Sequence, residues 1–232
     1  MKKLETINWG IIGVGDVTEV KSGPAFYKIE HSSVVAVMRR NAEKAADYAS
    51  RHGIPKWYSD ATDLINDPLV DAVYVATPPD SHASYAIEAM RAGKPVYVEK
   101  PMAGNFSECE EMLRVSKETG MPLWVAYYRR ALPAFLKAGE LIEAGDIGKP
   151  LVVNIRLFTQ ARERQQAKED MNWRVTPEIA GAGHFFDLAS HQFDYLDFIL
   201  GKVSGPRGCA ANLGGLYAAE DTVSGTWKHE SG

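Results

Sequence analysis

The sequence has few of the features that assign a chain to a specialised protein class. It contains only two cysteines, Cys109 and Cys209, which are too few for a disulfide scaffold, so a cytoplasmic protein is expected. No apolar run is long enough to cross a bilayer. The apolar run near the N-terminus is short and broken by glycines, and it lacks the cleavage site of a signal peptide.

Excess charge of one sign is also missing. The net charge of −4 gives no electrostatic reason to expect nucleic acid or an anionic membrane as a partner. What remains is an ordinary globular composition, with 45% apolar and 24% charged residues in a 232-residue chain. This length allows one large domain or two smaller ones.

The first half of the chain alternates between apolar strands and helices. Strands are expected at 7–12, 33–38, near 57, and at 71–76, 95–98 and 123–126, and helices at 41–52, 61–66, 81–92 and 106–119. Such alternation predicts a parallel sheet with helices on both faces. Residues 1–125 are therefore interpreted as a Rossmann domain, a doubly wound α/β fold.

A Gly-x-Gly turn follows the first strand. Gly13 and Gly15, with Asp16 and Val17 behind them, can bring backbone N–H groups against a pyrophosphate. Thr18 stands where the dinucleotide fingerprint prefers a third glycine, which predicts a wider helix–strand approach or a helix that starts late.

The end of the second strand indicates which dinucleotide is bound. An acid there binds the ribose hydroxyl of NAD, whereas an arginine accommodates the phosphate of NADP. Here the strand ends in Arg39 and Arg40, and the nearest acid, Glu43, already lies in the helix. NADP(H) is therefore predicted over NAD(H), with the alternative that one or both arginines lie on a solvated surface.

Two further strand ends carry candidate residues at the edge where such sheets bind ligands. Thr77 and Pro78 follow the fourth strand, and His82 comes shortly after, either capping the next helix locally or contacting the cofactor. Glu99 and Lys100 follow the fifth strand. Lys100 is expected to point into the crevice at that edge.

The helix expected over 184–200 carries the candidate chemistry. Asp187 and His191 lie one turn apart on one face, in a stripe with His184 and Tyr195. Most other positions are apolar, and a face formed by Phe185, Leu188, Ala189, Leu196 and Ile199 is expected to pack on a core. A carboxylate and an imidazole on a buried helix need partners or a ligand. Gly181 and Gly183 would let another group approach the first turn closely.

Other interpretations of this helix remain open. Asp187 could complement the helix dipole, and His191 could be a satisfied core histidine. A metal site built from His184, Asp187 and His191 is a further alternative, although no dense cluster of carboxylates or thiols accompanies them. No metal is therefore predicted.

The remainder of the second half predicts a smaller domain over 126–232. A helix is expected at 132–144, strands at 151–158, 203–213 and 217–227, and a loop at 161–172. Three strands would leave hydrogen-bonding edges uncovered. The chain is therefore expected to be truncated at its C-terminus.

In order along the chain, the Gly-x-Gly turn, the Thr77-Pro78 segment through His82, Glu99-Lys100-Pro101 and Asp187-x-x-x-His191 resemble the glucose-fructose oxidoreductase, inositol dehydrogenase and MocA (Gfo/Idh/MocA) family. The resemblance implies an NAD(P)-binding first domain and an α+β second domain, whose mostly antiparallel sheet often forms a dimer contact. Ala182 departs from the family's glycines, and the chain is shorter than most members.

The resemblance also assigns roles to particular residues. Lys100, Asp187 and His191 match the family's catalytic lysine, aspartate and histidine. By the same resemblance, Tyr128, Arg129 and Arg130 fall where substrate or cofactor is contacted, and Trp173 and Arg174 lie on a loop over the nicotinamide. The implied activity is hydride transfer between the cofactor and a secondary alcohol or ketone of a sugar or polyol. A glycosidase of this fold that uses NAD, or a non-catalytic NADP-binding sensor, are the alternatives.

Overall fold

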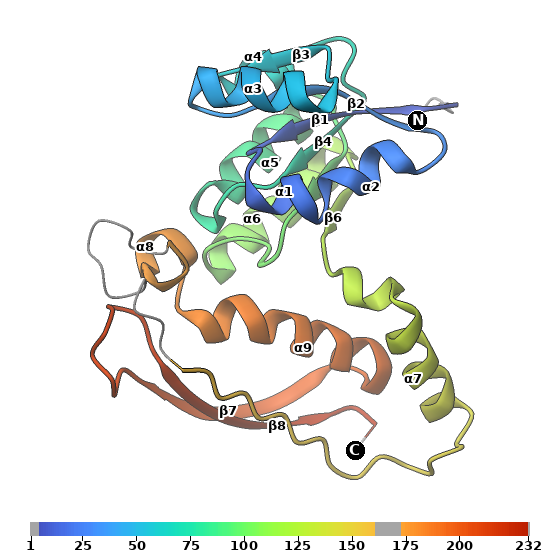
Figure 1. Ribbon diagram of the computed structural model, residues 1–232. Coiled ribbons are helices and arrows are strands. Elements are labelled where there is room, and N and C mark those ends of the chain that lie inside the picture. Colours follow the sequence, from blue (N-terminus) through green and yellow to red (C-terminus); the bar gives the residue numbers. More distant parts are fainter. Residues whose placement is uncertain (1–4, 161–172, 232) are drawn as a thin grey trace. The chain divides into compact units, whose positions relative to one another are not determined.

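The computed structural model describes residues 5–160 and 173–231, so the loop expected over 161–172 lies outside the described residues. The chain divides into two compact units, Met1–Ala126 and Tyr127–Gly232 (Figure 1). Each unit has its own secondary structure, and each is described by itself below.

The first unit contains a six-stranded, wholly parallel sheet with the order β3-β2-β1-β4-β5-β6. Its strands are β1 (Ile7–Ile12), β2 (Ser32–Met38), β3 (Lys56–Tyr58), β4 (Ala72–Val75), β5 (Val96–Val98) and β6 (Leu123–Val125). Its helices are α1 (Asp16–Val20), α2 (Gly23–Lys28), α3 (Ala42–His52), α4 (Ala61–Ile65), η1 (Pro79–Ser81), α5 (His82–Arg91) and α6 (Phe106–Thr119). This is the doubly wound order expected from the alternating pattern.

Alternate residues of the strands enter two separate cores, because successive side chains point to opposite faces. Ile12 and Val73 pack with residues of α4, α5 and α6 on one face. Ile11 and Tyr74 pack with residues of α2 and α3, including Phe26, on the other. Both faces are thus covered, as the near-continuous apolar strands predict.

Local signals explain where several helices begin. Asn41 caps α3 as expected, because its Oδ1 accepts a hydrogen bond from Lys44 N at 2.9 Å. Helix α2 was not predicted. It begins at Gly23 with Pro24 in its first turn, which is a favourable position for proline. A helix this short shows no clear periodicity in the sequence.

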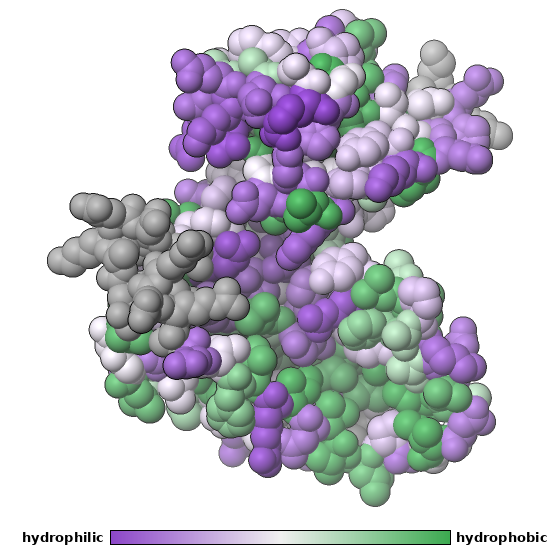
Figure 2. Space-filling model, in the orientation of Figure 1, coloured by the Kyte–Doolittle hydropathy of each residue, from purple (hydrophilic) through white to green (hydrophobic). Residues whose placement is uncertain are grey.

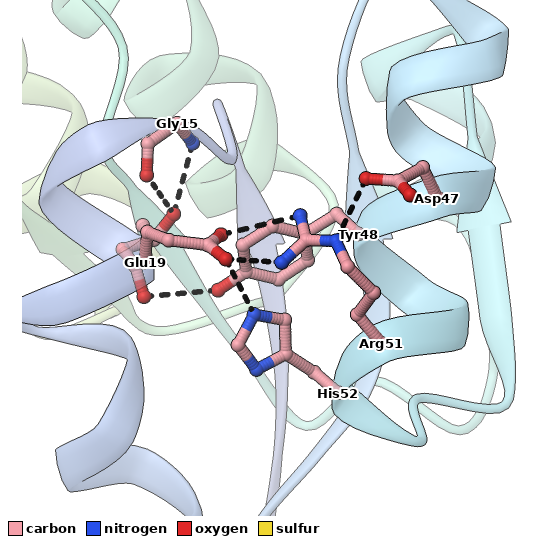
Figure 3. A network of polar contacts seen from close by, with 7 residues as sticks. Gly15, Glu19, Asp47, Tyr48, Arg51 and His52 are labelled. Atoms are coloured by element: carbon pink, nitrogen blue, oxygen red, sulfur yellow. Dashed lines mark hydrogen bonds and ion pairs between the residues drawn. The ribbon is translucent and has the colours of Figure 1, made fainter.

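A polar network joins α1 to α3 (Figure 3). The Arg51 guanidinium binds the carboxylates of Asp47 and Glu19, and it holds the pKa of Glu19 below its usual range. His52 Nε2 lies 3.2 Å from the same Glu19 carboxylate. The Tyr48 hydroxyl donates to the Thr18 carbonyl at 3.0 Å. These contacts hold the helix that follows the glycine turn against the neighbouring helix.

The second unit contains a long helix and an antiparallel pair of strands. Its elements are η2 (Tyr128–Ala131), α7 (Pro133–Glu143), η5 (Trp173–Val175), α8 (Pro177–Ala180), α9 (His184–Leu200), β7 (Val203–Ala211) and β8 (Thr222–His229). The helix over 184–200 has the predicted bounds. Strands β7 and β8 pair with each other from Val203 and His229 to Ala211 and Thr222.

The strand expected over 151–158 is not formed. Residues 151–160 have no regular secondary structure, and Leu151 and Val152 are each 80% exposed. A strand requires a hydrogen-bonded neighbour. Within the described residues, however, β7 and β8 pair only with each other. Hydrophobic residues accordingly cover much of the surface that this unit presents in Figure 2.

The face of α9 that was expected to pack on a core is only partly covered. Leu196 is buried as predicted, but Phe185 is 40% exposed, which corrects that expectation. Asp187 and His191 are instead among the buried residues of the helix. Within the described parts of the chain, no helix has the length and apolar character needed to span a membrane.

Candidate functional site

The glycine turn packs directly against the end of β4. Gly13 has a φ of +96°, a conformation that favours glycine. A Cβ at Gly13 would lie 2.6 Å from Thr77 Cγ2 and 2.8 Å from the Thr77 backbone nitrogen. Gly13 N also donates to the Met38 carbonyl at the end of β2. The turn therefore lies among the carboxyl ends of three adjacent strands.

Thr18 completes the turn in a way that the sequence did not suggest. Its hydroxyl donates to the Gly15 carbonyl and accepts from Gly15 N, both at 2.9 Å. Helix α1 begins at Asp16, directly after the turn, so the expectation of a late start was wrong. The close approach for which a glycine is required occurs at Gly23, where a Cβ would lie 1.9 Å from the Thr18 carbonyl oxygen.

Gly15 has the geometry required of a residue that faces a pyrophosphate. Its backbone is extended, and a Cβ built on it would meet no atom within 4 Å. The space beside Gly15 is therefore open, and a side chain would fill it. Asp16 is exposed and Val17 is half-buried at the start of α1. The open space at Gly15 makes this turn a candidate for contact with the pyrophosphate of a dinucleotide.

The two arginines after β2 differ in exposure. Arg39 is half-buried and its backbone nitrogen donates to the Tyr58 carbonyl, whereas Arg40 is exposed. Strand β2 lies beside β1, so Arg39 follows the strand end next to the glycine turn. This location suits recognition of a ribose or its phosphate.

Lys100 follows β5 at the same edge of the sheet. The Glu99 carboxylate accepts a hydrogen bond from the Lys100 backbone nitrogen at 3.2 Å and another from the Tyr74 hydroxyl. Burial raises the pKa of Tyr74, so the hydroxyl keeps the proton that it donates. Ser22 Oγ lies 2.8 Å from the same hydroxyl. The strand end that carries Lys100 is thereby tied to the segment that follows the glycine turn.

The His82 side chain contacts both the segment that follows β4 and the segment that follows β5. It is fully buried, and its Nε2 lies 2.7 Å from the Thr77 carbonyl and its Nδ1 2.9 Å from the Pro101 carbonyl. Burial lowers its pKa, while the two carbonyls act in the opposite direction. A neutral ring donates from one nitrogen only, so the tautomer decides which of the two carbonyls accepts the hydrogen bond. These contacts give His82 a local role that joins the loops carrying Thr77 and Lys100.

Replacing His82 by leucine is expected to lower the free energy of unfolding by about 1–3 kcal/mol, because the carbonyl that accepts the His82 N–H loses its donor. Urea unfolding followed by tryptophan fluorescence measures this change. The matched control is His31→Asn, since His31 is exposed with a φ of +62°, a conformation that asparagine tolerates. Wild-type stability of the leucine variant would show that the two carbonyls do not need His82.

Asp187 on α9 has a cationic neighbour within the second unit. Arg174 Nε lies 3.5 Å from Asp187 Oδ2, and its guanidinium lies over the Trp173 ring, 4.2 Å from the centroid. Asp187 is 8% exposed. A buried carboxylate is stabilised by such a partner. The structure thus places the Trp173–Arg174 pair beside Asp187, which lies in a different segment of the sequence.

His191 lies one turn further along α9 and is in contact with aromatic rings. The centroids of the Tyr128 and Tyr127 rings lie 5.0 and 6.1 Å from that of the imidazole, at interplanar angles of 74° and 77°. His191 is 5% exposed. Arg129, also a candidate, has its guanidinium over the Phe135 ring, 5.6 Å from the centroid.

The N-terminus of α9 is capped by the chain itself. Gly183 N donates to Glu220 Oε1 at 2.8 Å, and a Cβ at Gly183 would lie 2.6 Å from the Glu220 carbonyl oxygen. The group that approaches the first turn of this helix is therefore Glu220, from the loop between β7 and β8. Among the described residues, no group of three histidine, cysteine or acidic side chains could hold a metal ion.

Several partners of the candidate residues were not indicated by the sequence. Asp194 binds the Arg130 guanidinium, and the Tyr74 hydroxyl donates to Glu99. Asp194 lies three residues after His191, so helical spacing could have indicated that it shares a face with the histidine. No local pattern indicates Glu220 or Tyr74, because each meets its partner only through the tertiary fold.

Comparison with known proteins identifies both halves of the chain. Residues 7–127 match the model of an oxidoreductase family with an NAD-binding Rossmann fold, and residues 135–232 match the Gfo/Idh/MocA C-terminal domain. Oxidoreductase P35 of Formosa agariphila is 48% identical over 197 residues, which are 85% of this chain and 61% of that protein. The 1,5-anhydro-D-fructose reductase of Ensifer adhaerens is 30% identical over 226 residues, which are 97% of this chain and 66% of that protein.

A solved structure of another dehydrogenase has a similar fold. The WlbA dehydrogenase from Bordetella pertussis, in complex with NADH and UDP-GlcNAcA, superimposes with a TM-score of 0.86 at 27% identity, covering 98% of this chain and 69% of that one. Other homologues are named as dehydrogenases of sugars and polyols. The chain spans less than two thirds of the length of the first two relatives. The chain belongs to the Gfo/Idh/MocA family of oxidoreductases with an NAD-binding Rossmann fold.

Proposed function

We propose that this protein is an NAD(P)-dependent oxidoreductase acting on a secondary alcohol or ketone of a sugar or polyol. The observation that carries the proposal is the buried Asp187–His191 pair on α9, in a chain whose glycine turn has open space at Gly15. A carboxylate and an imidazole withdrawn from water need partners or a ligand, and Arg174 is one such partner for Asp187. Homologues named as sugar and polyol dehydrogenases support the substrate class.

Each of three side chains has a proposed role. When bound, the nicotinamide supplies the site that accepts or donates hydride. His191 takes the alcohol proton as the hydride leaves, because the ordinary pKa of an imidazole lies near neutrality. Asp187 orients the substrate hydroxyls and favours the imidazolium that forms. Lys100 holds the substrate oxygen and stabilises its developing negative charge.

The remaining candidates are proposed to hold the cofactor and the substrate. The pyrophosphate would lie beside Gly13 and Gly15 and against the first turn of α1, at Asp16 and Val17. Arg39 and Arg40 would receive the phosphate of NADP, because arginine matches a phosphate with paired N–H donors. Thr77, Pro78, Glu99, Trp173 and Arg174 are proposed contacts of the cofactor, and Tyr128 and Arg129 are proposed contacts of the substrate.

The proposal is tested by following nicotinamide absorbance with a panel of substrates. The panel contains levoglucosan and myo-inositol with NAD⁺ or NADP⁺, and 1,5-anhydro-D-fructose with NADH or NADPH. At least one substrate is expected to cause net oxidation or reduction of the cofactor, and the reaction is expected to be faster with NADP(H) than with NAD(H). Preference for NAD(H) would overturn the role of the arginines and leave the hydride-transfer proposal intact.

Two other outcomes would replace the proposed function. Cleavage of a p-nitrophenyl glycoside without net change in nicotinamide absorbance would identify a glycosidase that uses its cofactor transiently. Binding of NADPH, measured by fluorescence, without turnover of any panel member or glycoside would favour a non-catalytic NADP-binding protein.

A further inference from the structure

The Arg130–Asp194 pair, hereafter the Arg130–Asp194 clamp, joins η2 to α9. Arg130 Nε lies 3.0 and 2.8 Å from the two Asp194 carboxylate oxygens, and Nη2 lies 2.6 Å from Oδ1. The guanidinium also lies over the Phe198 ring, 4.9 Å from its centroid. The Asp194 side chain is 8% exposed, so the carboxylate is largely withdrawn from water. A forked contact of this kind fixes orientation more strictly than a single hydrogen bond.

The same two segments meet a second time at Tyr128 and His191. Tyr128 precedes Arg130 by two residues, and His191 precedes Asp194 by three, so the ring contact and the clamp are neighbouring links between η2 and α9. No residue of η2 itself is buried. This turn therefore gains little from burial of apolar surface, and side-chain contacts such as the clamp determine its place on α9.

We propose that Arg130 and Asp194 are positioning residues, which hold the Tyr128 ring against His191 and so fix the orientation of the imidazole. Because the Arg130 guanidinium binds Asp194, we expect Arg130 to influence His191 indirectly, through the position of the Tyr128 ring. The relevance to catalysis rests on the proposed role of His191 as the proton acceptor. An imidazole held in another orientation presents its nitrogen to the substrate less well, and misplacement by about 1 Å can cost about 100-fold in rate.

The test uses Arg130→Lys, which keeps the positive charge but cannot form the fork. The readout is the ring C–H NMR signal of His191, assigned through its loss in His191→Gln. Tyr128→Leu serves as the reference, because it removes the aromatic ring that shifts this signal. Arg130→Lys is expected to shift the His191 signal in the same direction as Tyr128→Leu. Asp194→Asn, which removes the carboxylate charge, is expected to do the same.

The matched control is Arg114→Lys on α6, where the arginine binds Glu111 and Glu118 on the exposed surface of the first unit. It is expected to leave the His191 signal unchanged. If any panel substrate is turned over, Arg130→Lys should lower kcat about 10- to 100-fold with cofactor affinity unchanged.

An unmoved His191 signal in both Arg130→Lys and Asp194→Asn would overturn the proposal, even if the melting temperature fell, because a purely structural pair would produce that result. The NMR outcome does not depend on turnover. It therefore remains decisive if the proposed hydride transfer fails its own test.

Discussion

Replacing His191 by alanine is expected to lower turnover about 10²- to 10⁴-fold, the range for loss of a positioned acid–base group. The physical reason is that hydride leaves an alcohol only when its proton also leaves, and alanine offers no acceptor. Lys100→Met should cause a loss of similar size, because the developing charge on the substrate oxygen loses its ammonium partner. NADPH binding, measured by fluorescence titration, should be unchanged in both variants.

The controls for these variants change the same residue types elsewhere. His31→Asn replaces an exposed histidine, and Lys117→Met replaces a lysine in the last turn of α6. Both should keep wild-type turnover. If His191→Ala or Lys100→Met retained near-full activity, that residue would have no place in the proposed mechanism.

Replacing Gly15 by valine is expected to weaken NADPH binding by about 100-fold, equivalent to about 2.7 kcal/mol. The extended backbone at Gly15 accepts a β-branched residue, and a Cβ there meets no protein atom within 4 Å. The side chain would instead occupy the space proposed for the pyrophosphate. The melting temperature should therefore change by no more than about 2 °C.

Gly13→Ala provides the contrast to this variant. Its Cβ would lie 2.6 Å from Thr77 Cγ2, at a φ of +96°, so the substitution should destabilise the fold itself. Calorimetry and fluorescence titration together separate loss of folding from loss of binding. Unchanged NADPH affinity in a folded Gly15→Val variant would contradict the proposed location of the pyrophosphate.

The apolar patterns of the sequence predicted most of the long helices and buried strands correctly. Buried parallel strands are apolar throughout, so the six strands of the first unit were expected near their observed positions. The long apolar stretch of α9 was also expected, with the bounds His184–Leu200. Helix α2 was missed, because six residues are too few to establish a periodicity. The strand over 151–158 was wrongly predicted, since alternation alone does not supply a partner strand.

Spacing along the sequence shows which residues lie close together when they belong to the same helix or strand. Asp187 and His191 lie four residues apart on α9, and any helix places such residues on one face. The candidates at the ends of β1, β4 and β5 could be grouped because parallel strands end at one edge of a sheet. The family resemblance of the motifs was likewise visible in the sequence and is confirmed by the matches over both halves.

The tertiary structure decided the partners of these residues. The contacts of His82 with Thr77 and Pro101, of Glu220 with Gly183 and of Arg130 with Asp194 join segments that no local pattern relates. Helical and strand periodicity follow from the backbone geometry of neighbouring residues, so the sequence alone determines them to a large extent. A hydrogen bond between distant side chains depends on how the whole unit packs, and only the folded chain brings its two ends together.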